Sequence, residues 1–191
     1  LIDAAKGTLL GRTEVEQPRG VAFDDAGRLL VLLARTLAAW DVVSEGTGLR
    51  LRRSDWQSPV LFEDPQGLAL DEQGQFYVSD WGKSHQVKAL SPDGKLVRTI
   101  GRPGAPRVGP YDPLHMNHPK GLTVASDGKL WVAEQWLAPK RVSVWTQEGE
   151  LVKAMYGPMR YGGGGSLDPR DRTRFFASFA DGHNPRLGGG M

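Results

Sequence analysis

Apolar residues recur along this chain in short bursts, separated by turns rich in Gly, Asp and Pro. Several bursts alternate apolar with polar side chains, which is the period of a half-buried β-strand. In the middle of the chain four bursts follow one another, at residues 67–71, 75–80, 86–90 and 95–100. The turns between them carry Asp and Gly residues, which tolerate positive φ. The pattern predicts four antiparallel strands joined by short loops.

This four-strand unit begins with a Pro-x-Gly sequence that runs directly into a short apolar strand, a combination that occurs three times, at Pro18, Pro65 and Pro119. The prolines recur after 47 and then 54 residues, a spacing near the repeat lengths of propellers. The third unit predicts strands at 121–125, 129–134, 141–146 and 150–156. The first unit, with less regular turns, predicts strands at 20–24, 28–33, 37–43 and 49–55. Because four antiparallel strands make one propeller blade, we predict an all-β fold, a β-propeller with three complete four-stranded blades.

Both ends of the chain read as incomplete blades within one propeller domain, residues 1–180. Residues 1–15 resemble the third and fourth strands of a blade, and residues 166–179 resemble the first two. Together they would close a ring of four blades; separately, they would belong to a slice of a larger propeller, for example a six-bladed one. We expect the slice, because the Gly- and Pro-containing tail 181–191 is typical of a disordered end. Open blade edges would then favour self-association.

Composition excludes several classes of site. The chain has no cysteine, so disulfides, zinc-thiolate centres and thiol nucleophiles are absent. No apolar run is long enough to span a bilayer. The net charge is only +2, but residues 83–110 hold six Lys or Arg against one Asp. Such a basic strip can attract nucleic acid, although its alternation with apolar residues favours a solvated outer strand.

The middle unit, PQGLALDEQGQFYVSDWGKSHQVKALSPDGKLVRTIG, resembles the NHL repeat. That repeat has a Pro-x-Gly strand, an Asp-Gly turn, a strand ending like Tyr-Val-Asp, and a strand with Arg or Gln before Val. The third unit has Glu134 where the family usually has Asp, and the first unit lacks the acidic residue. The three repeats span about 17–58, 64–110 and 118–157. The resemblance implies a propeller and leaves activity open, because NHL-like propellers include scaffolds, RNA readers, a copper- and zinc-dependent amidating lyase and related calcium lactonases.

Two acidic residues, Asp80 and Glu134, end equivalent strands, and a tryptophan follows each, at Trp81 and Trp136. Strand-end loops of a propeller ring one face, so these residues are candidates to bind a ligand there, with the indoles stacking on rings. The alternative is structural. The resemblance implies that such an acid pairs with a basic residue of the next strand, here Glu134 with Arg141, and holds a loop.

His115 and His118 stand three residues apart in the connection between the second and third units, near Asp112. Two imidazoles and a carboxylate can share a metal ion. A third fixed ligand is not evident, since His85 and His183 lie elsewhere in the sequence. We therefore expect a solvated loop here and no cofactor.

From these observations we expect a non-catalytic binding or scaffold domain that recognises a protein or glycan through its loops. An extracytoplasmic or cell-surface protein would suit such a module. The alternative from another class is part of a metal-dependent propeller enzyme, a lyase or a lactonase-type hydrolase. RNA binding through the basic strip is the second alternative.

Overall fold

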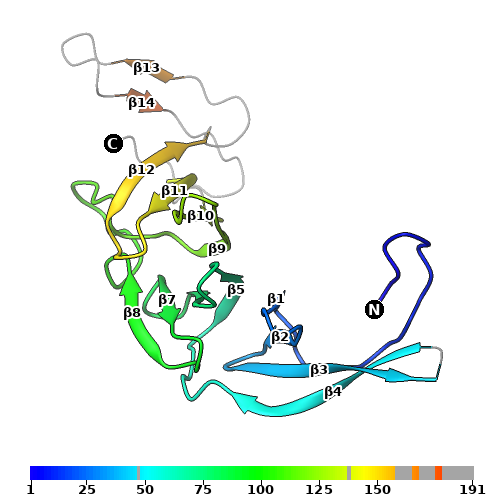
Figure 1. The fold of residues 1–191 in the computed structure, drawn as a ribbon. Coiled ribbons are helices and arrows are strands. Elements are labelled where there is room, and N and C mark those ends of the chain that lie inside the picture. Colours follow the sequence, from blue (N-terminus) through cyan, green and yellow to red (C-terminus); the bar gives the residue numbers. More distant parts are fainter. Residues whose placement is uncertain (47, 137–138, 158–164, 168–174, 178–191) are drawn as a thin grey trace.

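The computed structural model describes residues 1–46, 48–136, 139–157, 165–167 and 175–177. All regular elements in these residues are strands, and no helix among them is long and apolar enough to cross a membrane. Three sheets of four antiparallel strands follow one another along the chain (Figure 1). The predicted three complete blades are therefore confirmed.

The blades have the same strand order, each running in sequence from one edge of its sheet to the other. Blade 1 contains β1 (Val21–Phe23), β2 (Leu29–Leu32), β3 (Leu37–Glu45) and β4 (Gly48–Gln57). Blade 2 contains β5 (Pro65–Leu70), β6 (Phe76–Asp80), β7 (Gln86–Leu90) and β8 (Leu96–Ile100). Blade 3 contains β9 (Pro119–Val124), β10 (Leu130–Glu134), β11 (Arg141–Trp145) and β12 (Leu151–Tyr156).

Strands β5 and β9 begin at the repeat proline, two residues before the predicted starts. Proline lacks an N–H and is tolerated in a sheet on an edge strand or at the first position of a strand. Both conditions hold, because among the described strands β5 pairs with β6 alone and β9 with β10 alone. In blades 2 and 3 the Pro-x-Gly motif is thus the start of the first strand, whereas in blade 1 it precedes β1, which begins at Val21.

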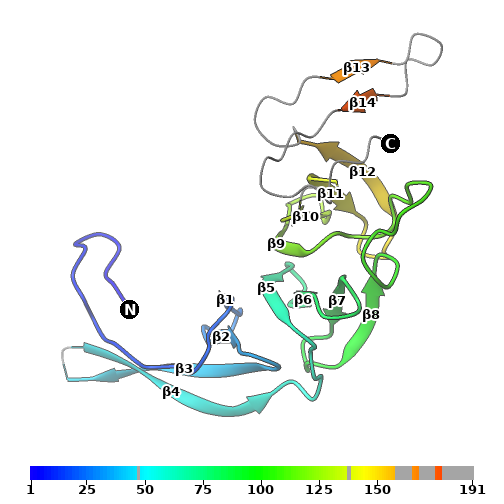
Figure 2. The same cartoon turned by 180° about the vertical axis from the view of Figure 1, so that it is seen from behind.

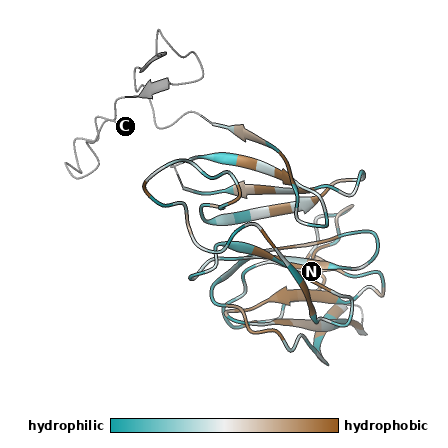
Figure 3. Ribbon diagram, turned by 90° about the vertical axis from the view of Figure 1, so that its left-hand side faces the viewer, coloured by the Kyte–Doolittle hydropathy of each residue, from teal (hydrophilic) through white to brown (hydrophobic). Residues whose placement is uncertain are grey.

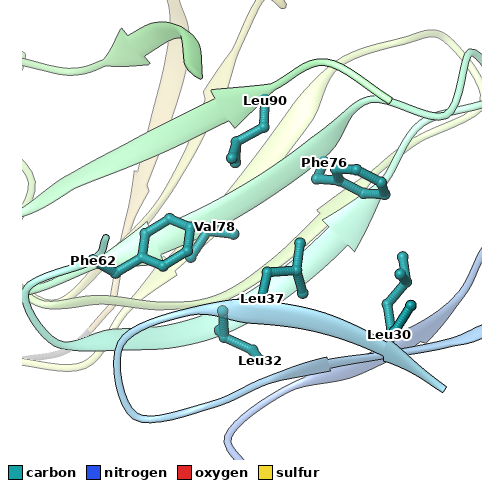
Figure 4. Close-up of a cluster of buried hydrophobic side chains, with 8 residues drawn as sticks. Leu30, Leu32, Leu37, Phe62, Phe76, Val78 and Leu90 are labelled. Carbon is teal, nitrogen blue, oxygen red and sulfur yellow. The ribbon is translucent and has the colours of Figure 1, made fainter. Parts of the chain in front are cut away.

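The core lies between the blades. Leu30, Leu32 and Leu37 of blade 1 pack against apolar residues of blade 2 and of the segment leading into it, and Figure 4 shows these side chains facing one another. A second buried cluster joins blades 2 and 3, where Tyr77 and Val87 meet Trp145. Figure 3 shows the hydrophobic colouring mainly on the strands. Each blade is therefore held by burial against its neighbour.

Blade 2 lies between blades 1 and 3 in Figure 1 and in the reverse view of Figure 2. Strands β13 (Gly165–Leu167) and β14 (Phe175–Ala177) pair with each other in a sheet of their own. The N-terminal segment contains one isolated bridge, between Ile2 and Leu9. In the residues described, no strand pairing joins the two ends. The half-blade assignments stay predictions, and the tail 181–191 lies outside the described residues.

Candidate functional site

The connections that follow β6, β8 and β10 emerge at the same end of blades 2 and 3. In blade 2, Asp80 at the end of β6 is paired with Pro65 at the start of β5, and β8 also ends on this side. In blade 3, Glu134 at the end of β10 is paired with Pro119 at the start of β9. We call this end the loop face; its residues are 81–85, 101–118 and 135–136. The opposite end, which we call the turn face, carries the tight turns 24–27, 71–74, 91–94, 125–128 and 146–149. All of the sequence-predicted site residues lie at or beside the loop face.

Asp80 is fully buried at the end of β6. Its Oδ1 accepts the N–H of Asp64 at 2.7 Å, and its Oδ2 accepts the N–H of Glu63 at 3.0 Å. The ammonium group of Lys88 on β7 forms an ion pair with the same carboxylate. Asp80 thus fixes the segment that leads into β5 and ties it to β7.

Glu134 occupies the equivalent position in blade 3. Its Oε2 accepts the N–H of Asn117 at 2.6 Å, and its Oε1 accepts Arg141 Nε–H at 2.6 Å and the Ser143 hydroxyl at 3.0 Å. Burial raises the pKa of Glu134, while the Asn117 N–H and the Arg141 guanidinium act in the opposite direction. With these donors supplied, the side chain acts as an anchor for the chain entering β9.

The Arg141 guanidinium donates three hydrogen bonds to the connection between blades 2 and 3. Nη1 donates to Tyr111 Oη at 2.7 Å and to the Pro113 carbonyl at 2.8 Å, and Nη2 donates to the His115 carbonyl at 2.9 Å. The Arg141 side chain has no exposed surface. The ion pair with Glu134 that the family resemblance implies is present. Asp80, Glu134 and Arg141 are therefore engaged inside the protein, and a surface ligand reaches none of their charged atoms directly.

The two tryptophans meet around a histidine. The His118 ring lies 4.9 Å from Trp81, edge to face, and 4.9 Å from Trp136, tilted by 35°. The His85 ring stands perpendicular to His118 with centroids 4.3 Å apart. We call these four residues the indole–imidazole cluster. Blades 2 and 3 each contribute to it, so it exists only because the blades are stacked.

Both histidines of the cluster have left-handed backbone conformations, with φ of 47° at His85 and 54° at His118. Such conformations cost about 1 kcal/mol or more outside glycine and often occur at functional positions. The backbone N–H of His118 donates to His85 Nδ1 at 3.1 Å. This Nδ1 therefore carries no proton, and burial lowers the pKa of His85. The contact between the two histidines requires His85 to be neutral.

The tryptophans differ in exposure. Trp81 is half-buried, and its Nε1–H donates to the Pro119 carbonyl at 2.7 Å, which links blade 2 to blade 3. Trp136 is 53% exposed. An indole that is supported on one side by His118 and open to solvent on the other can stack on a planar or ring-shaped group. Trp136 is the most solvent-exposed member of the cluster.

The predicted metal candidates do not converge. His115 Nδ1 lies 2.8 Å from the Gly104 carbonyl and His115 Nε2 lies 3.7 Å from Asp112, whereas His118 packs between the tryptophans. Within the described ranges no three His, Asp or Glu side chains are arranged to hold one metal ion. The sequence reasoning missed His85 as a partner of His118. A sequence signal for this contact exists. His85 lies in the loop after the second strand of its blade, and His118 directly precedes Pro119, the proline of the next repeat.

The basic strip is divided between the two faces. Lys95 lies in a turn at the turn face and pairs with Asp93, whereas Arg102 lies on the loop face and pairs with Asp112. Lys88 pairs with buried Asp80. Three of the six cations of the strip are thus paired with acidic residues. RNA binding stays a prediction.

The profile of the NHL repeat matches residues 62–90, which hold the segment entering blade 2 and strands β5, β6 and β7. A probable peptidyl-alpha-hydroxyglycine alpha-amidating lyase of Caenorhabditis elegans is 32% identical over 92 residues, 48% of this chain and 25% of that protein. NHL repeat-containing protein 3 of Mus musculus is 28% identical over 113 residues, 58% of this chain and 28% of that protein. The chain thus spans about a quarter of the length of these relatives.

Solved structures with similar folds include the hydrazine synthase of Kuenenia stuttgartiensis, with a TM-score of 0.52 and 17% identity over 90% of this chain and 44% of that one. A protein of carbohydrate-active enzyme family AA12 from Trichoderma reesei has a TM-score of 0.51 and 17% identity, over 74% of this chain and 41% of that one. At such identities the likeness concerns the fold alone.

Proposed function

We propose that this chain, an NHL-repeat β-propeller, is a non-catalytic binding module that recognises a glycan or a protein through its loop face. The observation that carries the proposal is the indole–imidazole cluster, with Trp136 exposed and backed by His118. We assign a structural role to the charged residues nearby, because Glu134 and Arg141 are buried and paired with each other. Binding then depends on stacking rather than on a buried charge.

Two features support a surface dedicated to contact. Trp136 exposes a large aromatic side chain that adds little to the core, although aromatic rings usually contribute most when buried. Its support is rigid, since Trp81 is tied to Pro119 and His118 is held by hydrogen bonds to His85 and Asn117. A preordered aromatic surface loses little conformational entropy on binding.

The proposal is tested by screening the purified chain on arrays of oligosaccharides and of extracellular protein domains, followed by titrations with the best binders. We expect Trp136→Ala to weaken binding at least tenfold, in line with the loss of an aromatic anchor. Circular dichroism and thermal unfolding of the same variant are expected to change little, because half of the side chain is already exposed.

Trp131→Ala is the matched control. Trp131 belongs to the same blade but lies on its sheet face beneath Lys153, 5.3 Å from the ammonium group, and not at the loop face. It is expected to leave affinity unchanged even where it lowers stability. If Trp136→Ala and Trp131→Ala bind every selected ligand equally well, the loop-face assignment is wrong. The array on which binders occur separates a glycan from a protein ligand.

A second candidate function, a metal-dependent lyase, is favoured by one observation, the 32% identity over 92 residues with the probable lyase of Caenorhabditis elegans. The matched region is only 25% of that protein. Elemental analysis of the purified protein for zinc, copper and calcium tests this candidate. Stoichiometric metal that persists through dialysis would support the enzyme; its absence, with a ligand found on the arrays, would support the binding module.

A further inference from the structure

The turn face carries a cavity of about 640 Å³, at the opposite end of the blades from the indole–imidazole cluster. Its wall comes from all three blades: the first turn of each contributes, at Phe23 and Asp25, at residues 70–73, and at residues 124–126 with Gly128. A cavity of this size falls within the range of small-ligand sites. It exists because the three first turns stand side by side.

The lining has a negative charge that the neighbouring cations do not neutralise. Asp25, Asp71 and Glu72 line the cavity, and no Lys, Arg or His does among the described residues. The basic residues of these turns are each paired to an acid of the same turn, in Arg28–Asp24, Lys95–Asp93 and Lys129–Asp127. The carboxylates of the lining therefore favour a cation over an anion.

The three carboxylates have different roles. Asp71 is buried and holds its own turn, since it accepts the N–H groups of Gln73 and Gln75 at 2.9 Å and the Tyr77 hydroxyl at 3.0 Å. Asp25 and Glu72 are exposed and make no hydrogen bond or ion pair with the described residues. The last two carboxylates belong to different blades, so the charge they supply to a ligand comes from two walls.

The cavity also offers a ring and an amide. Phe23 is 58% exposed on the lining and can place its ring face toward a cation. Gln147 spans blades, with Nε2 3.4 Å from Asp71 Oδ2. Within the described residues no three carboxylates or imidazoles converge on one point. A compact metal ion would be under-coordinated, whereas an elongated organic cation can reach two separated carboxylates and the ring.

We propose that this cavity binds an organic cation, an alkylammonium or guanidinium group, with Asp25 and Glu72 as its charge partners and Phe23 as its aromatic contact. Two sources share this chemistry, a free polyamine and the side chains of a basic peptide. The site is independent of the proposed loop-face function, because the two sites share no residue.

The test is isothermal titration calorimetry of the purified chain with three probes: spermidine, an acetylated and amidated Gly-Arg-Arg-Gly peptide, and the same peptide with citrulline in place of arginine. We expect one of the two cationic probes to bind with a stoichiometry of one and the citrulline peptide to fail. Calcium chloride is the competitor, and at matched ionic strength it is expected not to displace the probe.

Asp25→Asn and Glu72→Gln are each expected to weaken binding about two- to fivefold, in keeping with a partly screened charge pair, and the double variant about tenfold. Phe23→Leu keeps an apolar side chain without the ring and is expected to cost about twofold or more. Asp127→Asn is the control, because it removes the same charge from a neighbouring turn outside the lining. It is expected to change affinity less than twofold.

Binding by spermidine alone assigns the site to polyamines, and binding by the peptide alone assigns it to basic chains. The proposal is overturned if neither probe binds, if the citrulline peptide binds equally well, if calcium displaces the probe stoichiometrically, or if Asp127→Asn weakens binding as much as Asp25→Asn. Trp136→Ala must leave this binding unchanged, which separates failure here from failure of the loop-face function.

Discussion

Arg141 Nε donates to Glu134 Oε1 at 2.6 Å, and neither side chain has exposed surface. Removing one partner of a buried pair leaves an uncompensated charge, which costs about 3–5 kcal/mol. We expect Glu134→Ala to lower the free energy of unfolding by about this amount, measured by urea denaturation. Asp127→Ala, which breaks the exposed pair with Lys129, is the control and is expected to have little effect. Equal losses in the two variants would contradict the assignment of Glu134 as an anchor.

The repeat glycines differ in what lies next to them. A Cβ on Gly67 would come within 2.2 Å of the Lys120 carbonyl oxygen in the neighbouring blade, whereas a Cβ on Gly121 would meet, among the residues that the structure describes, Ala133 alone, at 3.8 Å. We expect Gly67→Ala to destabilise the protein by about 1–3 kcal/mol through overpacking, and Gly121→Ala to change stability by less than about 0.5 kcal/mol. Thermal unfolding of the two variants side by side measures the difference.

This pair also tests the arrangement of the blades. If Gly67→Ala proved as well tolerated as Gly121→Ala, blades 2 and 3 would not be in backbone contact at the glycine. If Gly121→Ala instead cost as much as Gly67→Ala, another part of the chain would cover blade 3 in the same way that blade 3 covers blade 2.

Trp81 links blades 2 and 3 through its Nε1–H bond to the Pro119 carbonyl. We expect Trp81→Phe, which keeps a ring and removes the donor, to cost about 1 kcal/mol of stability. Trp136→Phe is the matched control, because no Trp136 hydrogen bond to the described residues exists and the side chain is half exposed. Denaturant titration is the measurement. A loss at Trp136→Phe as large as at Trp81→Phe would refute the link.

Acidification is expected to loosen the indole–imidazole cluster. Burial lowers the pKa of both His85 and His118 below the ordinary 6.5; the Glu63 carboxylate opposes the effect at His85, and His85 adds to it at His118. A lowered folded-state pKa means that the unfolded chain binds more protons. The contribution of the two neutral histidines to the free energy of unfolding is therefore complete above about pH 6.5. It is lost as the pH falls from there through their lowered pKa values.

His85→Asn isolates this effect. Asparagine tolerates the left-handed conformation, and its Oδ1 can accept the His118 N–H in place of Nδ1, but it does not titrate. We expect the variant to lose less stability than the wild type between pH 7.5 and pH 5, followed by tryptophan fluorescence during denaturation. An unchanged pH dependence would show that His85 titrates without affecting the fold.

Most of the blade architecture is predictable from the sequence, because strand alternation and Asp-Gly turns are local signals. The residues that pair with Asp80 and Glu134 are less predictable. The repeat pattern leads to Arg141 correctly, but in blade 2 the pattern's Gln86 donates to the Gly101 carbonyl and Lys88 pairs with Asp80. Lys88 and Ser143 occupy equivalent positions opposite Val78 and Val132. The residue that pairs with the acid is therefore the first residue of the third strand in blade 3, Arg141, but the third residue of that strand in blade 2, Lys88.

The candidate sites were only partly visible in the sequence. Trp81 and Trp136 could be singled out, since each follows a strand end. Their meeting with His85 and His118 depends on how far one blade rotates against the next, which no local pattern encodes. The cavity at Phe23, Asp25 and Glu72 depends on the same stacking. Contacts between repeats are decided by tertiary packing, whereas contacts within a repeat follow from its motif.

The guanidinium of Arg141 also constrains the order in which the chain can fold. The groups it holds, at Tyr111, Pro113 and His115, precede it by 30, 28 and 26 residues. At roughly 5 to 20 residues per second of synthesis, the connection between blades 2 and 3 waits on the order of seconds for its clamp. During that interval blade 2 has been synthesised, but the blade 3 residues that share its buried cluster are not yet all present. We therefore expect a nascent chain of this length to expose apolar surface that the longer chain buries.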